Sequence, residues 1–398
     1  ESISRRAACL ALLQQYPQTL SKVAEIIGSS SWAADYLTRH PILLDEVLDT
    51  RLYEIATDWA AFSTELNQRL AEYVGDTERE MDILREVHHA QVFRLLAQDI
   101  AGLQTVERLA DHLTELADIV VRTTLELCWG KLKDRHPHPE RPPKLAIIAY
   151  GKLGGKELGY GSDLDLVFLH NDPEPDAGEL YSRLIQRFST WMTSRTSAGI
   201  LFDTDFRLRP NGDAGMLVCT IDAFRDYQLK NAWVWEHQAL TRARFCAGDA
   251  ELGAQFEAIR IEILRQPRDL AKLMEDVLAM RKRMLDNHAT TSDEYFDIKQ
   301  DPGGLIDVEF IVQYLVLGHA HAHERLCGNL GNIALLGFAA ELGLIPPSLA
   351  DPVRDTYREF RRIQHALRLN GISGARVERA EHEHRIEAVS ALWTFVFD

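Results

Sequence analysis

The segment Asp163–His170 constrains this chain most, because it places two carboxylates within an otherwise apolar run. Its residues read Asp-Leu-Asp-Leu-Val-Phe-Leu-His, a pattern that predicts a buried strand. Residues two apart in a strand project to the same side, so Asp163 and Asp165 lie together while Leu164 faces the core. Two like charges this close raise each other's pKa unless a cation compensates them. A hard divalent cation, Mg²⁺ above all, suits such oxygen ligands.

A second segment, Ile200–Leu208, offers the same chemistry. As a strand it would carry Asp205, Arg207 and the following Arg209 on one face. Three carboxylates can hold two metal ions about 4 Å apart for phosphoryl transfer, and arginines can neutralise phosphate oxygens. The candidate catalytic and metal-binding residues are therefore Asp163, Asp165 and Asp205.

Two glycines, Gly154 and Gly155, follow a predicted strand over Leu145–Tyr150 and are expected to open a short helix. Backbone N–H groups at a helix start bind phosphate, and glycine permits close approach. The segment is not a Walker A loop, because the spacing to Lys156 is one residue too short and Glu157 stands where Ser or Thr is required. A lone Asp-x-Asp or glycine-rich turn is weak evidence, but strand, Gly-Gly, paired aspartates and a third Asp together predict a nucleotidyltransferase site.

Most of the rest of the chain is predicted to be helical, including 179–193 and 305–317. In the N-terminal region this follows from apolar residues that recur every three or four positions. The stretch 134–143 holds four of the 14 prolines and is read as a linker. We expect an α+β fold, mostly helical, with a small sheet core flanked by helical bundles. The expected domains are an N-terminal helical region over 1–133, a nucleotidyltransferase core over 144–222 and a C-terminal helical domain over 223–398.

Composition narrows the class of protein further. The 398 residues carry a formal net charge of −16, which disfavours duplex nucleic acid as a partner. No run of 18 apolar residues predicts a membrane helix, and no apolar segment follows the charged N-terminus as in a signal peptide. The cysteines form no CxxC pair, so we expect buried free thiols in the reducing cytoplasm. They are Cys9, Cys128, Cys219, Cys246 and Cys327.

Histidines outside the aspartate segments have structural as well as functional interpretations. The pair His136 and His138 is expected in a solvated loop. A second group of three histidines alternates with other residues. In a strand these side chains would lie on one face and could bind zinc, whereas in a helix they would point in different directions, and we expect a helix end there. That group is His319, His321 and His323.

Two further charged groups also leave alternatives open. The segment Trp233–Arg244 is predicted as one helix whose charged face either is simply solvated or contacts a substrate. Its polar and aromatic residues include Trp235, Glu236, His237 and Arg242. A third group borders Gly303-Gly304, where the glycines could merely end a strand before a helix. That group is Lys299, Asp307 and Glu309.

Several motifs together carry a resemblance to a known family. They are Gly151-Lys-Leu-Gly-Gly155, Ser162-Asp-Leu-Asp-Leu166, Asp205-Phe-Arg-Leu-Arg-Pro210, Trp235-Glu-His-Gln-Ala-Leu-Thr-Arg-Ala-Arg244, Phe296-Asp-Ile-Lys-Gln-Asp-Pro-Gly-Gly304 and Asp307-Val-Glu309. The chain resembles the polymerase-β-type nucleotidyltransferase superfamily and, over nearly its whole length, the bacterial glutamine synthetase adenylyltransferases. Family members carry two related nucleotidyltransferase domains, so this chain resembles one half.

The resemblance implies an enzyme that transfers AMP from ATP to a tyrosine hydroxyl of glutamine synthetase, releases pyrophosphate and regulates nitrogen assimilation. It favours the C-terminal, adenylylating half, with the phosphorolytic adenylyl-removing half and a non-catalytic nucleotide-sensing module as alternatives. It implies two Mg²⁺ ions, or Mn²⁺, with glutamine synthetase and the PII signalling protein as partners and glutamine as effector. The implied ATP-binding residues are Gly154, Gly155, Ser162, Arg207, Arg209 and Lys299.

Overall fold

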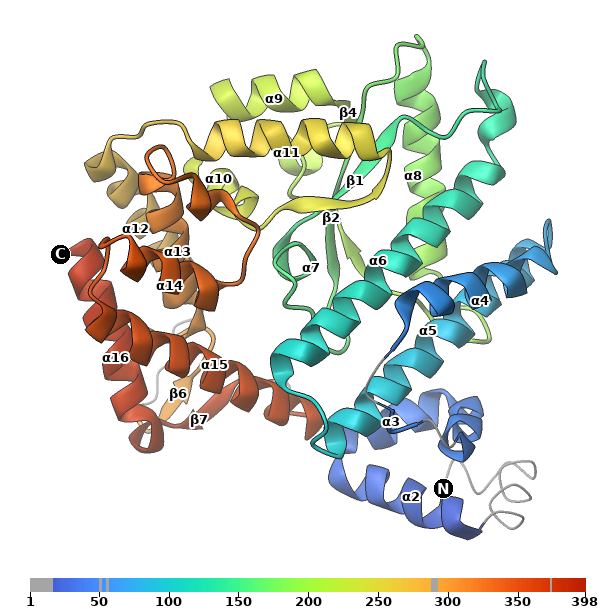
Figure 1. Ribbon diagram of the computed structural model, residues 1–398, viewed down its shortest axis with the longest axis horizontal. Coiled ribbons are helices and arrows are strands. Elements are labelled where there is room, and N and C mark those ends of the chain that lie inside the picture. The colour runs from blue at the N-terminus through green and yellow to red at the C-terminus, as the bar shows by residue number, and fades with distance from the viewer. Residues whose placement is uncertain (1–16, 50–51, 55–56, 288–292, 373) are drawn as a thin grey trace.

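The computed structural model describes residues 17–49, 52–54, 57–287, 293–372 and 374–398. The N-terminal segment considered for a signal peptide, and Cys9, lie outside these residues. The described part is mostly helical around a small sheet, which confirms the α+β prediction (Figure 1). The N-terminal region consists of α2 (Pro17–Ser29), α3 (Ser31–Arg39), the 3-10 helix η1 (Pro41–Leu48), α4 (Trp59–Ala71), α5 (Thr77–Ile100), α6 (Val106–Gly130) and η2 (Lys133–Arg135).

A mixed sheet forms the middle of the molecule (Figure 1). Strand β2 pairs antiparallel with β1, which pairs antiparallel with β5, and β3 and β4 run parallel to two successive parts of β2. The elements here are β1 (Leu145–Ala149), α7 (Gly151–Gly154), β2 (Leu164–His170), α8 (Ala177–Thr193), β3 (Thr204–Asp205), η3 (Gly212–Ala214), β4 (Val218–Thr220), α9 (Ile221–Lys230), α10 (Val234–Leu240), β5 (Arg244–Gly248) and α11 (Ala250–Leu264).

Both faces of the sheet are buried, which explains why β1 and β2 read as continuous apolar runs. Alternate residues face opposite layers. Leu164, Leu166 and Phe168 join the core made with the N-terminal helices and α8. Val167 and Leu169 join the separate core made with α9 and α11. The sheet is therefore held rigidly between two helical layers.

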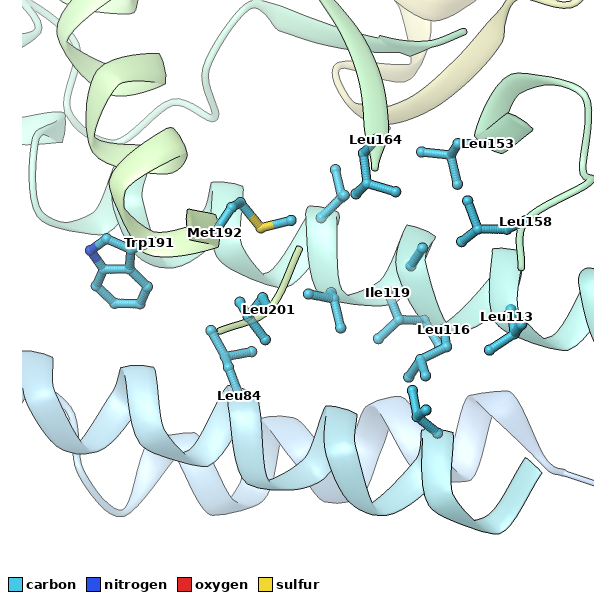
Figure 2. Packing of buried hydrophobic residues seen from close by; sticks show 14 of the residues in the cluster. Leu84, Leu113, Leu116, Ile119, Leu153, Leu158, Leu164, Trp191, Met192 and Leu201 are labelled. Atoms are coloured by element: carbon cyan, nitrogen blue, oxygen red, sulfur yellow. The ribbon is translucent and has the colours of Figure 1, made fainter. Parts of the chain in front are cut away.

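The start of β2 is anchored by the first of these cores (Figure 2). Leu164 is fully buried there with Leu153 and Leu158, close to α5 and α6. Burying a leucine side chain stabilises a fold by about 2 kcal/mol. Because Leu164 points into this core, its neighbours Asp163 and Asp165 point out of it, as the strand pattern predicted.

The C-terminal domain packs around its own apolar core. Helix α15 extends from this domain to the N-terminal helices, where it contacts α3 and α6 (Figure 1). Ser30 donates a hydrogen bond to the Leu369 carbonyl at 2.7 Å, which ties the end of α15 to the start of α3. The elements are α12 (Leu270–Asp286), β6 (Tyr295–Asp297), α13 (Leu305–His319), η4 (Glu324–Cys327), α14 (Asn332–Glu341), α15 (Pro347–Leu369), β7 (Arg376–Glu378) and α16 (Arg379–Phe397).

Two predicted elements are wrong in extent. The single helix expected over Trp233–Arg244 ends at Leu240, and Arg244 instead begins β5, because Cys246 and Ala247 are buried against β1. Strand β5 thus joins the sheet although it lies beyond the expected core of 144–222. The strand expected over Ile200–Leu208 shrinks to β3, after which the chain turns.

Candidate active site

The pairing of β2 with β3 brings the three predicted carboxylates together. Asp163 immediately precedes β2, Asp165 lies within it, and the parallel register sets Asp205 opposite Asp165. One ligand oxygen from each carboxylate lies within 4.8 Å of the others. Of the described residues, these alone form such a potential metal-binding group. Strand register, rather than loop conformation, therefore fixes the geometry of the aspartate trio.

The electrostatics of this aspartate trio favour a bound cation. Burial, followed by the charges of Asp163 and Asp205, raises the pKa of Asp165 to about 6. Asp205 differs, because hydrogen bonds from Arg207 hold its pKa below the usual value. A divalent cation would relieve the repulsion at Asp165, so the trio could hold a hard divalent cation.

The two predicted phosphate-binding arginines do not share a strand face, since β3 ends at Asp205. Asp205 Oδ1 accepts a hydrogen bond from the Arg207 backbone N–H at 2.8 Å, which turns the chain. The Arg207 guanidinium binds both oxygens of Asp205 and is otherwise exposed. Arg209 donates to the Phe206 and Gly215 carbonyls and so holds the turn closed. Arg207 thus supplies a positive charge at the trio, while Arg209 has a local structural role.

The prediction that Gly154 and Gly155 open a helix is wrong, because α7 ends there. Their backbone N–H groups donate to the carbonyls of Tyr150 and Gly151, at 2.8 and 3.0 Å, within the helical turn. A Cβ at Gly154 would lie 2.2 Å from the Arg242 carbonyl oxygen, and one at Gly155 would lie 2.6 Å from Arg242 Nε. These glycines are needed for the close passage of Arg242.

Sequence reasoning missed Gly151 and Lys152, although both stand in the Gly-Lys-Leu-Gly-Gly motif. Gly151 has a φ of +55°, and a Cβ there would lie 2.0 Å from Asp165 Oδ2. Lys152 Nζ lies 3.4 Å from the hydroxyl of Ser162. Partial burial and the charge of Lys299 lower the pKa of Lys152. Gly151 was missed because its positive φ and its contact with Asp165 depend on the fold and cannot be read from the sequence.

A cavity of about 670 Å³ lies between the N-terminal helices, the 156–162 loop and the C-terminal domain, and it reaches Ser162, which directly precedes Asp163 of the trio. Ser162 and Lys299, two predicted ATP-binding residues, both line it, as does Lys152. Within the described part of the chain, no carboxylate forms a salt bridge with Lys152, Lys299 or Arg368 on this wall. The apolar and aromatic lining includes Trp32, Val106, Leu109, Tyr160 and Ile372. The cavity could hold a ligand that is anionic at one end.

Asp307 and Glu309 have different surroundings. Asp307 is buried, pairs with Arg281 at 2.5 Å and accepts the Gly303 N–H at 2.7 Å, so it holds the domain together rather than facing the cavity. Glu309 lines the cavity and pairs with Arg242 at 3.3 Å. On α10, Glu236 accepts the Trp233 N–H and caps the helix.

The histidines and cysteines take structural positions. His136 is buried, contrary to the expected solvated loop, because its Nε2 lies 3.0 Å from Asp172. His319 stands at the end of α13, and His321 and His323 follow it, as expected for a helix end. The described cysteines carry free thiols, of which Cys219 is half-buried and the others are buried. They are Cys128, Cys219, Cys246 and Cys327.

None of the helices in the described residues has the length and apolar character required to cross a bilayer. Residues 20–259 match the family model of glutamate-ammonia ligase adenylyltransferase, and residues 271–387 match that of GlnD PII-uridylyltransferase. The first matched region contains the whole aspartate trio, and the second begins in α12 and ends in α16.

The chain is also similar to curated proteins named bifunctional glutamine synthetase adenylyltransferase/adenylyl-removing enzyme. It is 62% identical to that of Aromatoleum aromaticum over 397 residues, which is 100% of this chain and 42% of the relative. It is 56% identical to that of Chromobacterium violaceum over 370 residues, 93% of this chain and 41% of the relative. It therefore spans about two fifths of the length of these relatives. The family model matches more than half of the chain, and the matched region contains the aspartate trio. The chain therefore belongs to the glutamate-ammonia ligase adenylyltransferase family.

Proposed function

We propose that this chain transfers AMP from ATP to a tyrosine hydroxyl of glutamine synthetase and releases pyrophosphate. The observation that carries the proposal is the aspartate trio, with oxygens within 4.8 Å of one another, near a cavity whose lining includes Lys152, Lys299 and Arg368, which form no salt bridge with any described carboxylate. Membership of the family and the activity named for the relatives support the same reaction. Because the chain spans only part of those relatives, the proposal concerns a single site.

Two Mg²⁺ ions, or Mn²⁺, fit the trio by charge and by donor type. Three carboxylates with a pKa of about 6 at Asp165 mark a site where negative charge lacks compensation. Bound there, the ions would lower the pKa of an attacking hydroxyl and neutralise charge on the departing phosphates. Asp163, Asp165 and Asp205 would hold them.

The chain's own residues would place the nucleotide. Ser162, Lys152 and Lys299 line the cavity at the edge nearest the trio and would bind the phosphates. Arg207 is exposed, so its side chain can leave Asp205 for a phosphate oxygen when a metal ion replaces it. Gly154, Gly155 and Arg209 would support this site through local packing. Catalysis then depends on positioning and electrostatic stabilisation, as in other phosphoryl transfers.

Regulation forms part of the proposal. The match of residues 271–387 to a PII-uridylyltransferase model supports the PII signalling protein as a partner of the C-terminal domain. Glutamine would act as an effector of the same regulation. The relatives' name also includes adenylyl removal, which makes phosphorolysis of adenylylated glutamine synthetase the second candidate activity.

The test is incubation of this chain with α-labelled ATP, Mg²⁺ and unmodified glutamine synthetase, followed by measurement of label on the synthetase. A parallel reaction supplies labelled, adenylylated synthetase with inorganic phosphate and measures labelled ADP. Label transfer abolished by Asp163→Asn supports the proposal. ADP formation alone would assign the removing half, and ATP binding without either reaction would leave only a nucleotide sensor.

A further inference from the structure

Residues of two motifs that the aspartate trio does not use, Arg242 and Glu309, belong to one largely buried group of charges, which we call the Glu157 network. It consists of Glu157, Arg242, Glu309, Tyr357 and Arg361. Arg242 lies 2.6 Å from Glu157 and 3.3 Å from Glu309. Arg361 pairs with Glu157 at 3.2 Å, and the Tyr357 hydroxyl donates to the same carboxylate, also at 3.2 Å. All five residues line the cavity.

The backbone is shaped to admit Arg242 to this network. The Arg242 carbonyl touches Gly154, and its guanidinium passes over Gly155, where a Cβ would lie within 2.8 Å of two of its nitrogens. Any side chain at either glycine would push Arg242 away from Glu157. The Gly-Gly pair therefore leaves room for Arg242 in the network.

The network joins two parts of the molecule. Glu157 belongs to the 156–162 loop, which ends at Ser162 directly before Asp163. Glu309 lies on α13 and Tyr357 on α15, both in the C-terminal domain (Figure 1). Arg368, also near the end of α15, donates to the Gly161 carbonyl of the same loop at 3.1 Å. The loop that sets Ser162 and Asp163 is thus held from the C-terminal side.

The charges in the network satisfy one another. Burial alone would raise the pKa of Glu157, but Arg242 and Arg361 lower it below the usual value. The Glu157 and Arg242 side chains are 10% and 16% exposed, so solvent screens their interaction weakly. Removing one member of such a buried group leaves its partners without compensation.

We propose that Arg242 is a positioning residue, which holds the 156–162 loop against α13 and α15 and thereby fixes Ser162 and Asp163. The alignment of the aspartate trio consequently depends on how α13 and α15 of the C-terminal domain contact the 156–162 loop. The positioning of the 156–162 loop by Arg242 does not depend on which reaction the chain catalyses. Only the expected effect on adenylyl-transfer kinetics rests on the proposed function.

Hydrogen–deuterium exchange of the whole chain tests the positioning directly. Arg242→Met should increase exchange of the 156–162 amides at least tenfold, and Arg242→Lys should increase it less, because lysine retains one ion pair. Glu309→Ala, which leaves Arg242 paired with Glu157, should increase exchange in the same loop by about threefold. The matched control is Arg94→Met, since Arg94 also bridges two carboxylates, Glu46 and Asp49, at 2.7 and 2.6 Å. It should leave the loop unchanged.

Kinetics then separate positioning from general destabilisation. Arg242→Met should lower kcat about thirtyfold and change the KM for ATP less than threefold, because Lys152 and Lys299, the proposed phosphate-binding lysines, remain. Arg242→Lys should recover part of the loss. Loop exchange within twofold of wild type in folded Arg242→Met would overturn the proposal. If that variant does not fold, unchanged exchange in Glu309→Ala overturns it. Absence of adenylyl transfer in the wild-type chain would refute the proposed function and leave the exchange result standing.

Discussion

The Glu157 network and the aspartate trio stand at the two ends of one short loop, over 156–162, and differ in whether their charges are paired. In the network, two carboxylates meet two guanidiniums, and each charge has a partner. In the trio, three carboxylates gather with Arg207 as their only salt-bridging cation in the described residues, and the pKa of Asp165 rises to about 6. Paired charges can hold a loop in place, whereas carboxylates without compensating charge suit the binding of a divalent cation.

The largest expected effect comes from breaking the trio. Asp165→Asn should lower adenylyl transfer by about a thousandfold or more, since it removes a ligand from the metal site. The same substitution should increase the free energy of unfolding without metal by on the order of 2 kcal/mol, because it removes a carboxylate that burial and then the charges of Asp163 and Asp205 destabilise. Transfer assays and urea denaturation measure the two quantities.

Asp203→Asn is the matched control for this variant, since Asp203 is exposed and lies outside the trio. It should change neither activity nor stability. A stable but fully active Asp165→Asn protein would remove the trio from the mechanism.

Breaking the network should have the opposite effect on stability. Glu157→Gln leaves Arg242 and Arg361 without their shared carboxylate, so it should cost about 3 kcal/mol of unfolding free energy. Glu107→Gln removes an exposed ion pair to Arg358, also between α15 and another region, and should cost under about 0.5 kcal/mol. Equal losses in the two variants, measured by urea denaturation, would show that burial does not distinguish the network.

The trio should also respond to pH in a way that the network does not. Because the folded-state pKa of Asp165 is raised from 3.8 to about 6, the metal-free free energy of unfolding should fall as pH rises between these values. Metal binding needs the ionised carboxylate, so affinity for Mn²⁺ should be about tenfold weaker near pH 5 than near pH 7. Calorimetric titration across this range measures it, and a flat profile would contradict the raised pKa.

The smallest expected effect concerns Arg207, whose guanidinium pairs with Asp205 of the trio. Arg207→Ala should strengthen Mn²⁺ binding without nucleotide by roughly threefold, because the ion no longer competes with an exposed guanidinium. Calorimetric titration of the metal would detect this change. Weaker Mn²⁺ binding in this variant would instead mean that Arg207 supports the metal site.

Much of this arrangement could be predicted from the sequence because it depends on strand periodicity. The alternation around Leu164 places Asp163 and Asp165 on one side, and the third aspartate falls on the next strand. Helices α8 and α13 also lie where the sequence predicted helices. These features depend on local pattern, which sequence carries directly.

What could not be predicted depends on contacts between distant segments. The close passage of Arg242 over Gly155 is not visible in the sequence. Arg244 reads as helical until β5 pairs with β1. Gly151 is unremarkable in sequence, and only the fold shows that a Cβ there would strike Asp165. Tertiary contacts decide each of these positions, and no local propensity encodes them.

The most direct test of the central claim counts divalent ions at the trio. Mn²⁺ binding to the chain, saturated with a non-hydrolysable ATP analogue, can be followed by electron paramagnetic resonance at neutral pH. The account predicts two bound Mn²⁺ ions per chain for the wild type and for Asp203→Asn, and loss of both tight sites in Asp165→Asn. Unchanged Mn²⁺ binding in Asp165→Asn would contradict the account.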